Sequence, residues 1–400
     1  MTEWKKVKLG DCCEITSSKR IFFNEYVESG VPFYRSKEII EKSKGAKISE
    51  PLFISESRYN EIKNQFGVPL QGDLLLTAVG SLGIPYRIND SDPFYFKDGN
   101  LIWFRNFSEK LDSEFLCYWF KTQKAFQLLS NLAIGSAQKA LTISSVKQFA
   151  LDCPSLGIQQ RIAEVLSRYD ALIENYQRQI KLLEEAAQRL YKEWFVDLRF
   201  PGHETTPIIN GIPEGWEKKK LIEIADVQYG YAFDGSLFNC DKKGMPIVRI
   251  RNIPDGYTGD YTTEEASQEY IVRDSDILVG MDGIFHINTW SGGEAYLVQR
   301  ACSFRPKDQL LKGFILQAIY EPIKYFEKTL VGSTVAHLGK KHIDSILLLV
   351  PNNKSLFEPF TRFFNQRQGL LAQIRHLSEA RDRLLPKLMN GEIDIIDYNS

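Results

Sequence analysis

The chain has 400 residues, of which 43% are hydrophobic and 25% are charged, and its formal net charge is −1. This composition is typical of a globular protein with two or three domains, and the balanced charge excludes a uniformly basic chain. No run of about 18 apolar residues predicts a membrane span, and the first residues lack the apolar core of a signal peptide. A cytoplasmic protein is therefore expected.

The six cysteines are scattered along the chain. None forms a C-x-x-C pair, and none has a histidine at the spacing of a metal site. We therefore expect free thiols in a reducing compartment and no metal site.

Residues 1–153 are predicted to form the first globular domain. Short β-like runs cover residues 31–35, 74–79 and 101–105, and turns rich in Gly, Asp, Asn and Pro separate them. Residues 115–129 have helical periodicity instead. This mixture predicts an α+β domain with a strand-rich body and few helices.

Residues 154–200 are predicted to form one long helix. Its apolar residues recur in steps of three and four, which is the spacing of a seam along a helix that wraps around another helix. The seam consists of Ile162, Leu166, Tyr169, Ile173, Tyr176, Ile180, Leu183, Ala187, Leu190 and Trp194. Such a helix is about 60 Å long at about 1.5 Å per residue. Its apolar seam needs a partner helix; burial within one large domain is the alternative, which the length disfavours.

Residues 201–215 are rich in Pro and Gly and are predicted to be a linker. Residues 216–353 are predicted to form a second α+β domain. Its β-like runs and its helical segment cover residues 247–250, 277–279, 296–304 and 314–328.

Residues 354–392 are predicted to form a second long helix, followed by a tail at 393–400. Its apolar seam consists of Leu356, Phe360, Phe363, Leu370, Ile374, Leu377, Leu384 and Leu388. Arg367 and Arg381 fall on seam positions, where polar side chains cost stability but can fix the register of the pairing. This helix is the predicted partner of the first one.

The two halves of the chain are predicted to be a tandem repeat. WKKVKL at 4–9 aligns with WEKKKL at 216–221, and GVPFYR at 30–35 aligns with GMPIVR at 244–249. GDLLL at 72–76 aligns with SDILV at 275–279, and Gly135-Ser136 with Pro154 aligns with Gly332-Ser333 with Pro351. Each half is one globular domain followed by one long helix.

Catalytic motifs are incomplete in this sequence. DPFY at 92–95 is similar to the motif of amino-methyltransferases but lacks its second proline, and no Gly-rich loop is present to seat a methyl donor. GSTVAHLGKK at 332–341 has six residues between its glycines, whereas a phosphate loop has four. No serine–histidine–aspartate or paired-carboxylate arrangement is readable, so a binding protein is favoured over an enzyme.

Basic and aromatic side chains in the loops of both halves are the candidate DNA contacts, because Arg and Asn can bind base edges and Lys anchors phosphates. The alternative is that each is a solvated surface group. The equivalent placement of Arg35 and Arg249 favours a shared role, structural or DNA-facing. The loops at 80–81 and 282–286 align but share only glycine, as two readers of different sequences would. The candidates are Lys19, Arg20, Tyr34, Arg35, Lys37, Ser81, Tyr86, Arg87, Tyr229, Tyr231, Arg249, Arg251, Asn252, His286, Lys340 and Lys341.

Over nearly its whole length the chain resembles the specificity subunit of type I restriction–modification enzymes. The resemblance is strongest in the long helices, and only a sparse skeleton matches in the globular halves. Its segments are QRIAEVL at 160–166 after Pro154, AQRLYKEWFVD at 187–197 with FPG at 200–202, and LLPKLMNGEI at 384–393.

The resemblance implies two target recognition domains, each reading half of a bipartite DNA site, and two long helices that pair antiparallel as a coiled coil. It also implies two modification subunits that bind S-adenosylmethionine and methylate adenine, and restriction subunits that use ATP and magnesium. Those cofactors would belong to the partners. The family offers no catalytic residues to transfer, so this chain is expected to contribute recognition only.

Two other functions remain as alternatives. One is a free-standing DNA methyltransferase or nuclease, which would act on DNA without partners. The other is a coiled-coil scaffold or regulator that binds DNA or protein without any modification enzyme.

Overall fold

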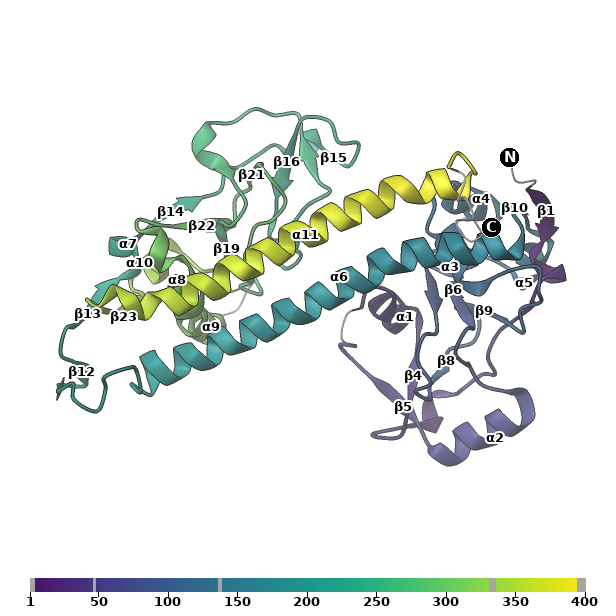
Figure 1. Ribbon diagram of the computed structural model, residues 1–400, viewed down its shortest axis with the longest axis horizontal. Coiled ribbons are helices and arrows are strands. Elements are labelled where there is room, and N and C mark those ends of the chain that lie inside the picture. The colour runs from purple at the N-terminus through teal and green to yellow at the C-terminus, as the bar shows by residue number, and fades with distance from the viewer. Residues whose placement is uncertain (1–3, 46–47, 136–138, 331–335, 394–400) are drawn as a thin grey trace. The chain divides into compact units, whose positions relative to one another are not determined.

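The computed structural model describes residues 4–45, 48–135, 139–330 and 336–393 (Figure 1). The aligned Gly135-Ser136 and Gly332-Ser333, the incomplete phosphate loop and most of the tail therefore lie partly or wholly outside the described residues. The chain divides into two compact units, Met1–Glu174 with Leu377–Ser400 and Asn175–His376. We call these unit 1 and unit 2. Each contains one globular half and a part of both long helices.

Sheets form the body of unit 1. One sheet has the order β2-β9-β6-β7 and is antiparallel throughout, and a second has the order β3-β5-β4-β8 with a parallel β4–β8 pair. β1 pairs with β10 and so joins the two ends of the globular half. The strands are β1 (Lys5–Lys8), β2 (Glu14–Thr16), β3 (Tyr26–Val27), β4 (Val31–Tyr34), β5 (Leu52–Ile54), β6 (Leu74–Thr77), β7 (Pro85–Arg87), β8 (Tyr95–Phe96), β9 (Leu101–Arg105) and β10 (Ala150–Cys153).

The helical segment predicted at 115–129 is two helices instead of one. Thr122 lies between them, and its hydroxyl accepts a hydrogen bond from the backbone N–H of Ala125 at 3.1 Å, which caps the second helix. The helices of this half are α1 (Ser36–Ser43), α2 (Glu56–Phe66), α3 (Ser113–Phe120), α4 (Gln123–Leu132) and α5 (Ile143–Gln148).

Unit 2 repeats the strand order of unit 1. Three of its sheets correspond to those of unit 1 and have the orders β14-β22-β19-β20, β15-β17-β16-β21-β18 and β13-β23. Within these sheets β18 is the added strand, and β16–β21 is again the parallel pair. This confirms the tandem repeat at the level of topology. The strands are β13 (Trp216–Lys220), β14 (Ala225–Tyr229), β15 (Phe238–Asn239), β16 (Met245–Val248), β17 (Tyr261–Thr262), β18 (Ile271–Val272), β19 (Ile277–Gly280), β20 (Ile287–Thr289), β21 (Ala295–Leu297), β22 (Ala301–Pro306) and β23 (Leu347–Pro351).

Two local predictions differ in this half. The run at 296–304 is two strands, β21 and β22, because the chain turns at Arg300 with a left-handed φ of 71°. The helical segment at 314–328 is likewise divided in two. The segment at 201–215 contains a short hairpin of β11 (Ile208–Ile209) and β12 (Ile212–Pro213). The helices are α7 (Leu221–Ile224), α8 (Lys312–Ala318), α9 (Tyr320–Thr329) and α10 (Lys340–Asp344).

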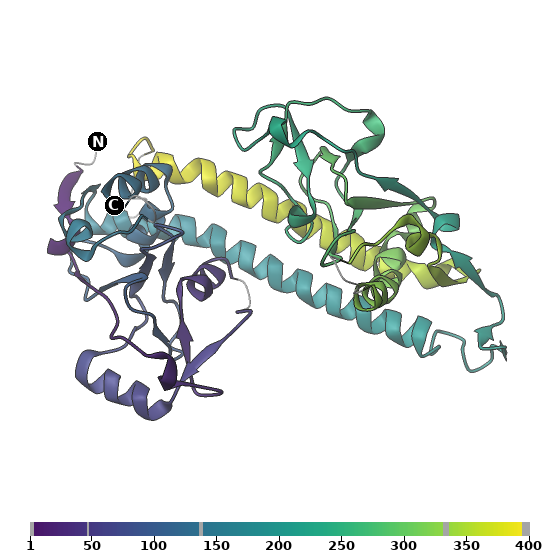
Figure 2. The same ribbon diagram turned by 180° about the vertical axis from the view of Figure 1, so that it is seen from behind.

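The two long helices are α6 (Leu156–Tyr191), which ends in a π-helical turn at Lys192–Val196, and α11 (Glu358–Met389). In unit 1 the first turns of α6 lie beside the last turns of α11, and Ile162, Leu166 and Leu388 share one buried core (Figure 1). In unit 2 the last turns of α6 lie beside the first turns of α11, where Tyr191 packs on Phe360 (Figure 2). The helices are therefore antiparallel within each unit.

The predicted seam residues lie inward. Ile162, Leu166, Ile173, Ile180, Leu356 and Phe360 are buried, and Tyr169, Tyr176, Leu183, Leu190, Phe363, Leu370, Ile374, Leu377 and Leu384 are half-buried. None of the helices in the described part of the chain has the length and apolarity that a membrane crossing requires.

Candidate nucleic-acid interface

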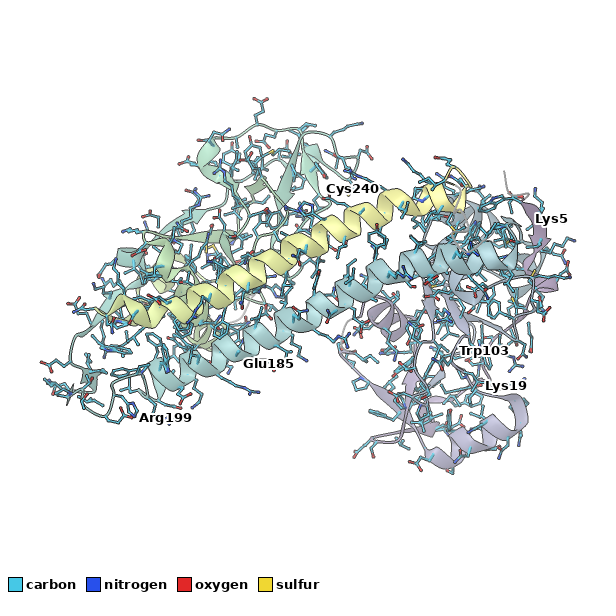
Figure 3. The ribbon with its side chains drawn as sticks, viewed as in Figure 1. Lys5, Lys19, Trp103, Glu185, Arg199 and Cys240 are labelled. Atoms are coloured by element: carbon cyan, nitrogen blue, oxygen red, sulfur yellow. The ribbon has the colours of Figure 1, made fainter. Side chains whose placement is uncertain are left out.

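Lys19 and Arg20 lie in the loop after β2. The ammonium nitrogen of Lys19 is 4.5 Å from the centre of the Phe66 ring at the end of α2, and Figure 3 shows Lys19 beside that helix. The backbone N–H of Lys19 donates to Tyr95 Oη at 2.6 Å, which fixes the loop. Arg20 Nε lies 2.9 Å from Asp98 Oδ2. Lys19 therefore keeps an unbalanced charge at the surface, whereas that of Arg20 is balanced.

Arg35 caps α1. Its backbone N–H donates to Glu38 Oε2 at 2.7 Å, and its guanidinium holds the same carboxylate with Nη2 at 2.5 Å from Oε1. The Glu38 side chain is 0% exposed, and a buried carboxylate needs such a partner. Burial alone would raise the pKa of Glu38, but the bonds from Arg35 hold that pKa below its ordinary value. Arg35 is thus bound into the fold, and the neighbouring Lys37 pairs with Glu50 at 3.1 Å.

Arg249 has the same backbone role in unit 2. Its N–H donates to Asn252 Oδ1 at 2.9 Å, the equivalent of the bond at α1. Asn252 is neutral, however, and the guanidinium of Arg249 lies over the Phe238 ring at 5.4 Å with no carboxylate partner among the described residues. The adjacent Arg251 is bound to both carboxylate oxygens of Asp260. Of the equivalent arginines, Arg249 alone keeps a free charge.

Four of the candidate tyrosines pack into the domains. Tyr34 and Tyr86 are buried and lie, with Phe94, around the ammonium group of Lys42, which is 5.3 Å from the Tyr34 ring and 5.6 Å from the Tyr86 ring. Burial raises the pKa of Tyr86, so the phenol stays neutral. Tyr34 and Tyr86 therefore contribute to packing, and a contact of either side chain with DNA stays a prediction. Sequence reasoning missed Lys42, which lies on α1, because Tyr86 and Phe94 come from segments that are distant along the chain.

The other two tyrosines are half-buried in unit 2. The hydroxyl of Tyr229 is buried and has no hydrogen-bond partner among the described residues, and burial raises its pKa to about 12. Tyr231 packs against Phe233 and Tyr270, with ring centres 4.8 and 5.1 Å apart. Both contribute to local packing more than to an open surface.

The β6–β7 hairpin carries Ser81 and Arg87. Ser81 is exposed, and its carbonyl accepts a bond from the Thr77 hydroxyl, which closes the turn. Arg87 Nε donates to Ser113 Oγ at 3.0 Å and its Nη1 to Asn89 Oδ1 at 2.8 Å. Both hydrogen-bond partners of Arg87 are neutral, and its charge acts on the nearby Glu114 without forming an ion pair.

The equivalent β19–β20 hairpin of unit 2 has different side chains. Asp282 lies between His337 and Arg300, with its carboxylate 2.5 Å from His337 Nδ1 and 3.3 Å from Arg300 Nη1. Burial and the nearby Lys324 lower the pKa of His286, which favours the neutral imidazole at pH 7 in the free chain. Sequence reasoning missed His337 and Arg300 because they come from separate segments.

Lys340 and Lys341 begin α10 and are exposed without an ion pair in the described part of the chain. Within the described ranges, no group of three or more His, Cys, Asp or Glu could hold a metal ion. Once the paired and buried candidates are set aside, the cations without a carboxylate partner are Lys19 and Arg87 in unit 1 and Arg249, Lys340 and Lys341 in unit 2. Each unit therefore has cations that can attract a polyanion such as DNA.

Comparison with known proteins identifies the family. The model of the type I restriction modification DNA specificity domain matches residues 1–185 and 213–375. The chain belongs to this family. This specificity subunit is 27% identical over 426 residues to the type I restriction enzyme MjaIX specificity subunit of Methanocaldococcus jannaschii, with 98% of this chain and 94% of the relative covered.

Two further similarities agree. The type I restriction enzyme EcoBI specificity subunit of Escherichia coli is 32% identical over 147 residues, which cover 36% of this chain and 31% of the relative. The crystal structure of the type I restriction–modification S subunit of M. genitalium matches with a TM-score of 0.57 at 17% identity, covering 97% of this chain and 96% of that one. The latter shows a shared fold. The chain is therefore a DNA specificity subunit in which each globular half offers free cations.

Proposed function

We propose that this specificity subunit recognises a DNA site in two parts, with residues 1–153 reading one part and residues 216–353 reading the other. The observation that carries the proposal is the repeated strand order with different side chains at equivalent positions. Arg35 is locked to a buried carboxylate while Arg249 is free, and the hairpin carrying Arg87 has no counterpart to the Asp282 cluster. Two domains with the same strand order and different surface side chains are expected to bind different base sequences.

Positioning and readout are divided among the free cations in this proposal. Lys19, Lys340 and Lys341 are flexible, exposed ammonium groups, which suit phosphate anchoring. Arg87 and Arg249 are held by a hydrogen-bonded frame or an aromatic ring and present a fixed planar fork, which suits the two acceptors of guanine.

The catalytic steps belong to partner subunits in this proposal, and the chain itself is not an enzyme. Two modification subunits would supply S-adenosylmethionine-dependent methylation, and restriction subunits would supply ATP- and magnesium-dependent cleavage. Support comes from the relatives' names, which describe specificity subunits of type I restriction enzymes. Co-purification with a methyltransferase would separate this proposal from a free-standing scaffold, and activity of the pure chain on DNA would contradict it.

The long helices would pair along their whole length as an antiparallel coiled coil that sets the spacing of the two half-sites and carries the modification subunits. The contacts of α6 with α11 found separately in unit 1 and in unit 2 support this pairing. A stiff connection of fixed length is what two readers need in order to leave a constant number of unread base pairs between them.

The test is a domain exchange. Residues 1–153 are replaced by the same region of a relative, and methylated adenines are sequenced across the genome of cells that also carry the modification subunits. One half of the recognised site should change and the other should stay. The reciprocal replacement of residues 216–353 should change only the second half. A change in both halves after one exchange would contradict independent readers.

A further inference from the structure

Among the residues that the structure describes, an ion pair joins the long helices in each unit. In unit 1, Arg381 Nη1 of α11 lies 2.5 Å from Asp170 Oδ1 of α6. In unit 2, Arg367 Nε of α11 lies 2.6 Å from Glu184 Oε1 of α6, one residue before the Glu185 labelled in Figure 3. In both pairs the carboxylate comes from α6 and the guanidinium from α11.

Neighbouring side chains hold both pairs in place. Asp170 also accepts a bond from Tyr118 Oη at 2.7 Å, and Lys121 Nζ is 3.5 Å away. Arg367 is 8% exposed, and it also donates to Asn288 Oδ1 at 2.8 Å and to the Thr289 hydroxyl. Charges held in fixed positions in this way, above all that of the buried Arg367, are costly when they lose their partner or meet a like charge.

The tandem repeat relates the two pairs. The alignment that sets Pro154 against Pro351 also sets α4 against α9, which are of equal length. The same separation sets Asp170 against Arg367 and Glu184 against Arg381. The repeat has therefore kept both positions on each helix but reversed the sign of the charge between α6 and α11.

We propose that Asp170, Glu184, Arg367 and Arg381 form a pairing code that makes α6 select α11 and reject a second α6. Position 170 faces position 381, which is the equivalent of position 184. If two α6 helices paired in the same register, Asp170 of one would face Glu184 of the other. Two α11 helices would likewise bring Arg367 against Arg381. The apolar seams do not discriminate, because both are built from Leu, Ile and aromatic residues.

The code gives the specificity subunit a way to close on itself instead of joining with another copy through like helices. It acts on the choice of helix partner and is independent of whether the globular halves read DNA. The partner that the code accepts is an α11 helix, from the same chain or, by exchange, from a second copy.

The experiment uses two full-length variants with different affinity tags, Glu184→Arg and Arg367→Glu. The pair in unit 2 is chosen because the other partners of Arg367 are neutral. Each variant alone has one like-charge contact. When the two chains exchange helices, the arginine introduced at position 184 of one chain meets the glutamate introduced at position 367 of the other. The unchanged Glu184 and Arg367 also meet, so both contacts become complementary. Co-expression followed by two-tag purification measures the mixed dimer.

We expect about tenfold more mixed dimer from this combination than from control chains, because exchange removes from each chain a like-charge contact at the pair that includes the buried position 367. The matched controls are Glu174→Arg and Arg362→Glu, which make the same changes at exposed positions of the same helices. The double variant Glu184→Arg/Arg367→Glu should regain the wild-type melting temperature and size. The charge-reversing Arg367→Glu alone should also lower the melting temperature more than the neutral Arg367→Gln does.

Mixed dimer no more abundant than in the controls would overturn the proposal. So would a reversal that is no worse than the neutral replacement, since the pair would then only add stability. If either variant fails to accumulate alone, co-expression still decides, because only exchanged chains are then recovered with both tags. Failure to recover them together counts against the code.

Discussion

Arg35 and Arg249 occupy equivalent caps, and what separates them is the third residue of the turn. The buried carboxylate of Glu38 binds the guanidinium of Arg35. Asn252 is neutral and binds only the backbone N–H of Arg249, so it leaves that guanidinium without an ion pair. The sequence alignment predicts that the two arginines share a role. The structure shows that the two arginines share the backbone cap, whereas only Arg249 has a guanidinium without an ion pair. This second difference depends on the burial of Glu38, which the alignment does not show.

Replacing Arg249 should therefore affect DNA binding, and replacing Arg35 should affect stability. Arg249→Ala should weaken binding of duplex DNA about tenfold, since it removes one phosphate or base contact, and leave the unfolding free energy nearly unchanged. Arg35→Ala should cost about 2 kcal/mol of stability, because Glu38 loses its partner, with DNA binding by the folded fraction unaltered. Fluorescence anisotropy and urea unfolding measure the two effects. Arg362→Ala, at an exposed position of α11, is the control for lost charge.

The Asp170 carboxyl makes part of the stability of unit 1 depend on pH. Burial alone would raise its pKa, but Lys121, Arg381 and Tyr118 hold that pKa below the ordinary value. The unfolded chain therefore binds more protons at this group than the folded chain does. The contribution is complete above the unfolded pKa of about 4 and is lost as the pH falls through the lower folded pKa.

Asp170→Asn should cost about 1–2 kcal/mol at pH 7, because the ion pair is partly buried. The difference in unfolding free energy between wild type and variant should shrink as the pH falls below about 4. Urea unfolding from pH 7 to pH 3 measures it, and other carboxyls cancel in the difference. The exposed Glu174→Gln is the control. A gap that stays constant down to pH 3 would show that Asp170 acts without its charge.

Among the elements, the packing of α8 on α11 depends on the absence of a side chain at Gly313. A Cβ there would lie 2.2 Å from the carbonyl oxygen of Phe360 and 3.1 Å from Phe364 Cβ. Sequence periodicity predicts a helix from residue 314 onward, and a glycine directly before it reads only as a weak helix former. The close approach of two backbones arises from tertiary packing and has no local pattern.

Gly313→Ala should therefore destabilise unit 2 by about 3 kcal/mol, since the contact is with backbone that cannot rotate away. At Gly369 of α11, no atom lies within 4 Å of the position that a Cβ would take, so Gly369→Ala should stabilise by about 1 kcal/mol through helix propensity alone. Thermal unfolding of both variants measures this difference in sign. Two stabilising substitutions would mean that α8 can move away from α11.

The same division between pattern and packing holds for the other elements. The long helices, their seams and the repeated strands follow from periodicity and alignment, because each pattern extends over many residues. The breaks at Thr122 and Arg300 depend on a single cap and a single left-handed residue. The rings around Lys42 and the two cationic side chains around Asp282 come from distant segments of the chain. The candidate site was therefore only partly predictable from the sequence.

At the scale of the whole molecule, the proposed function assigns spacing to the long helices. Along the chain, the division between unit 1 and unit 2 falls after Glu174 in α6 and after His376 in α11. These are the places where residues can be added without cutting the contacts inside either unit. Seven residues that continue the seam, inserted at both places, keep the apolar period and lengthen the helices by about 10 Å.

Such an insertion should lengthen the preferred spacer by about three base pairs and leave both half-sites unchanged, because about 3.4 Å of duplex separates adjacent base pairs. Sequencing of methylated adenines in cells with the modification subunits measures the spacing. The same seven residues inserted between Thr205 and Thr206, outside both long helices, should leave it as it was. Modification of sites at the original spacing by the lengthened subunit would refute the assignment, since the helices would then connect the readers without measuring the distance between half-sites.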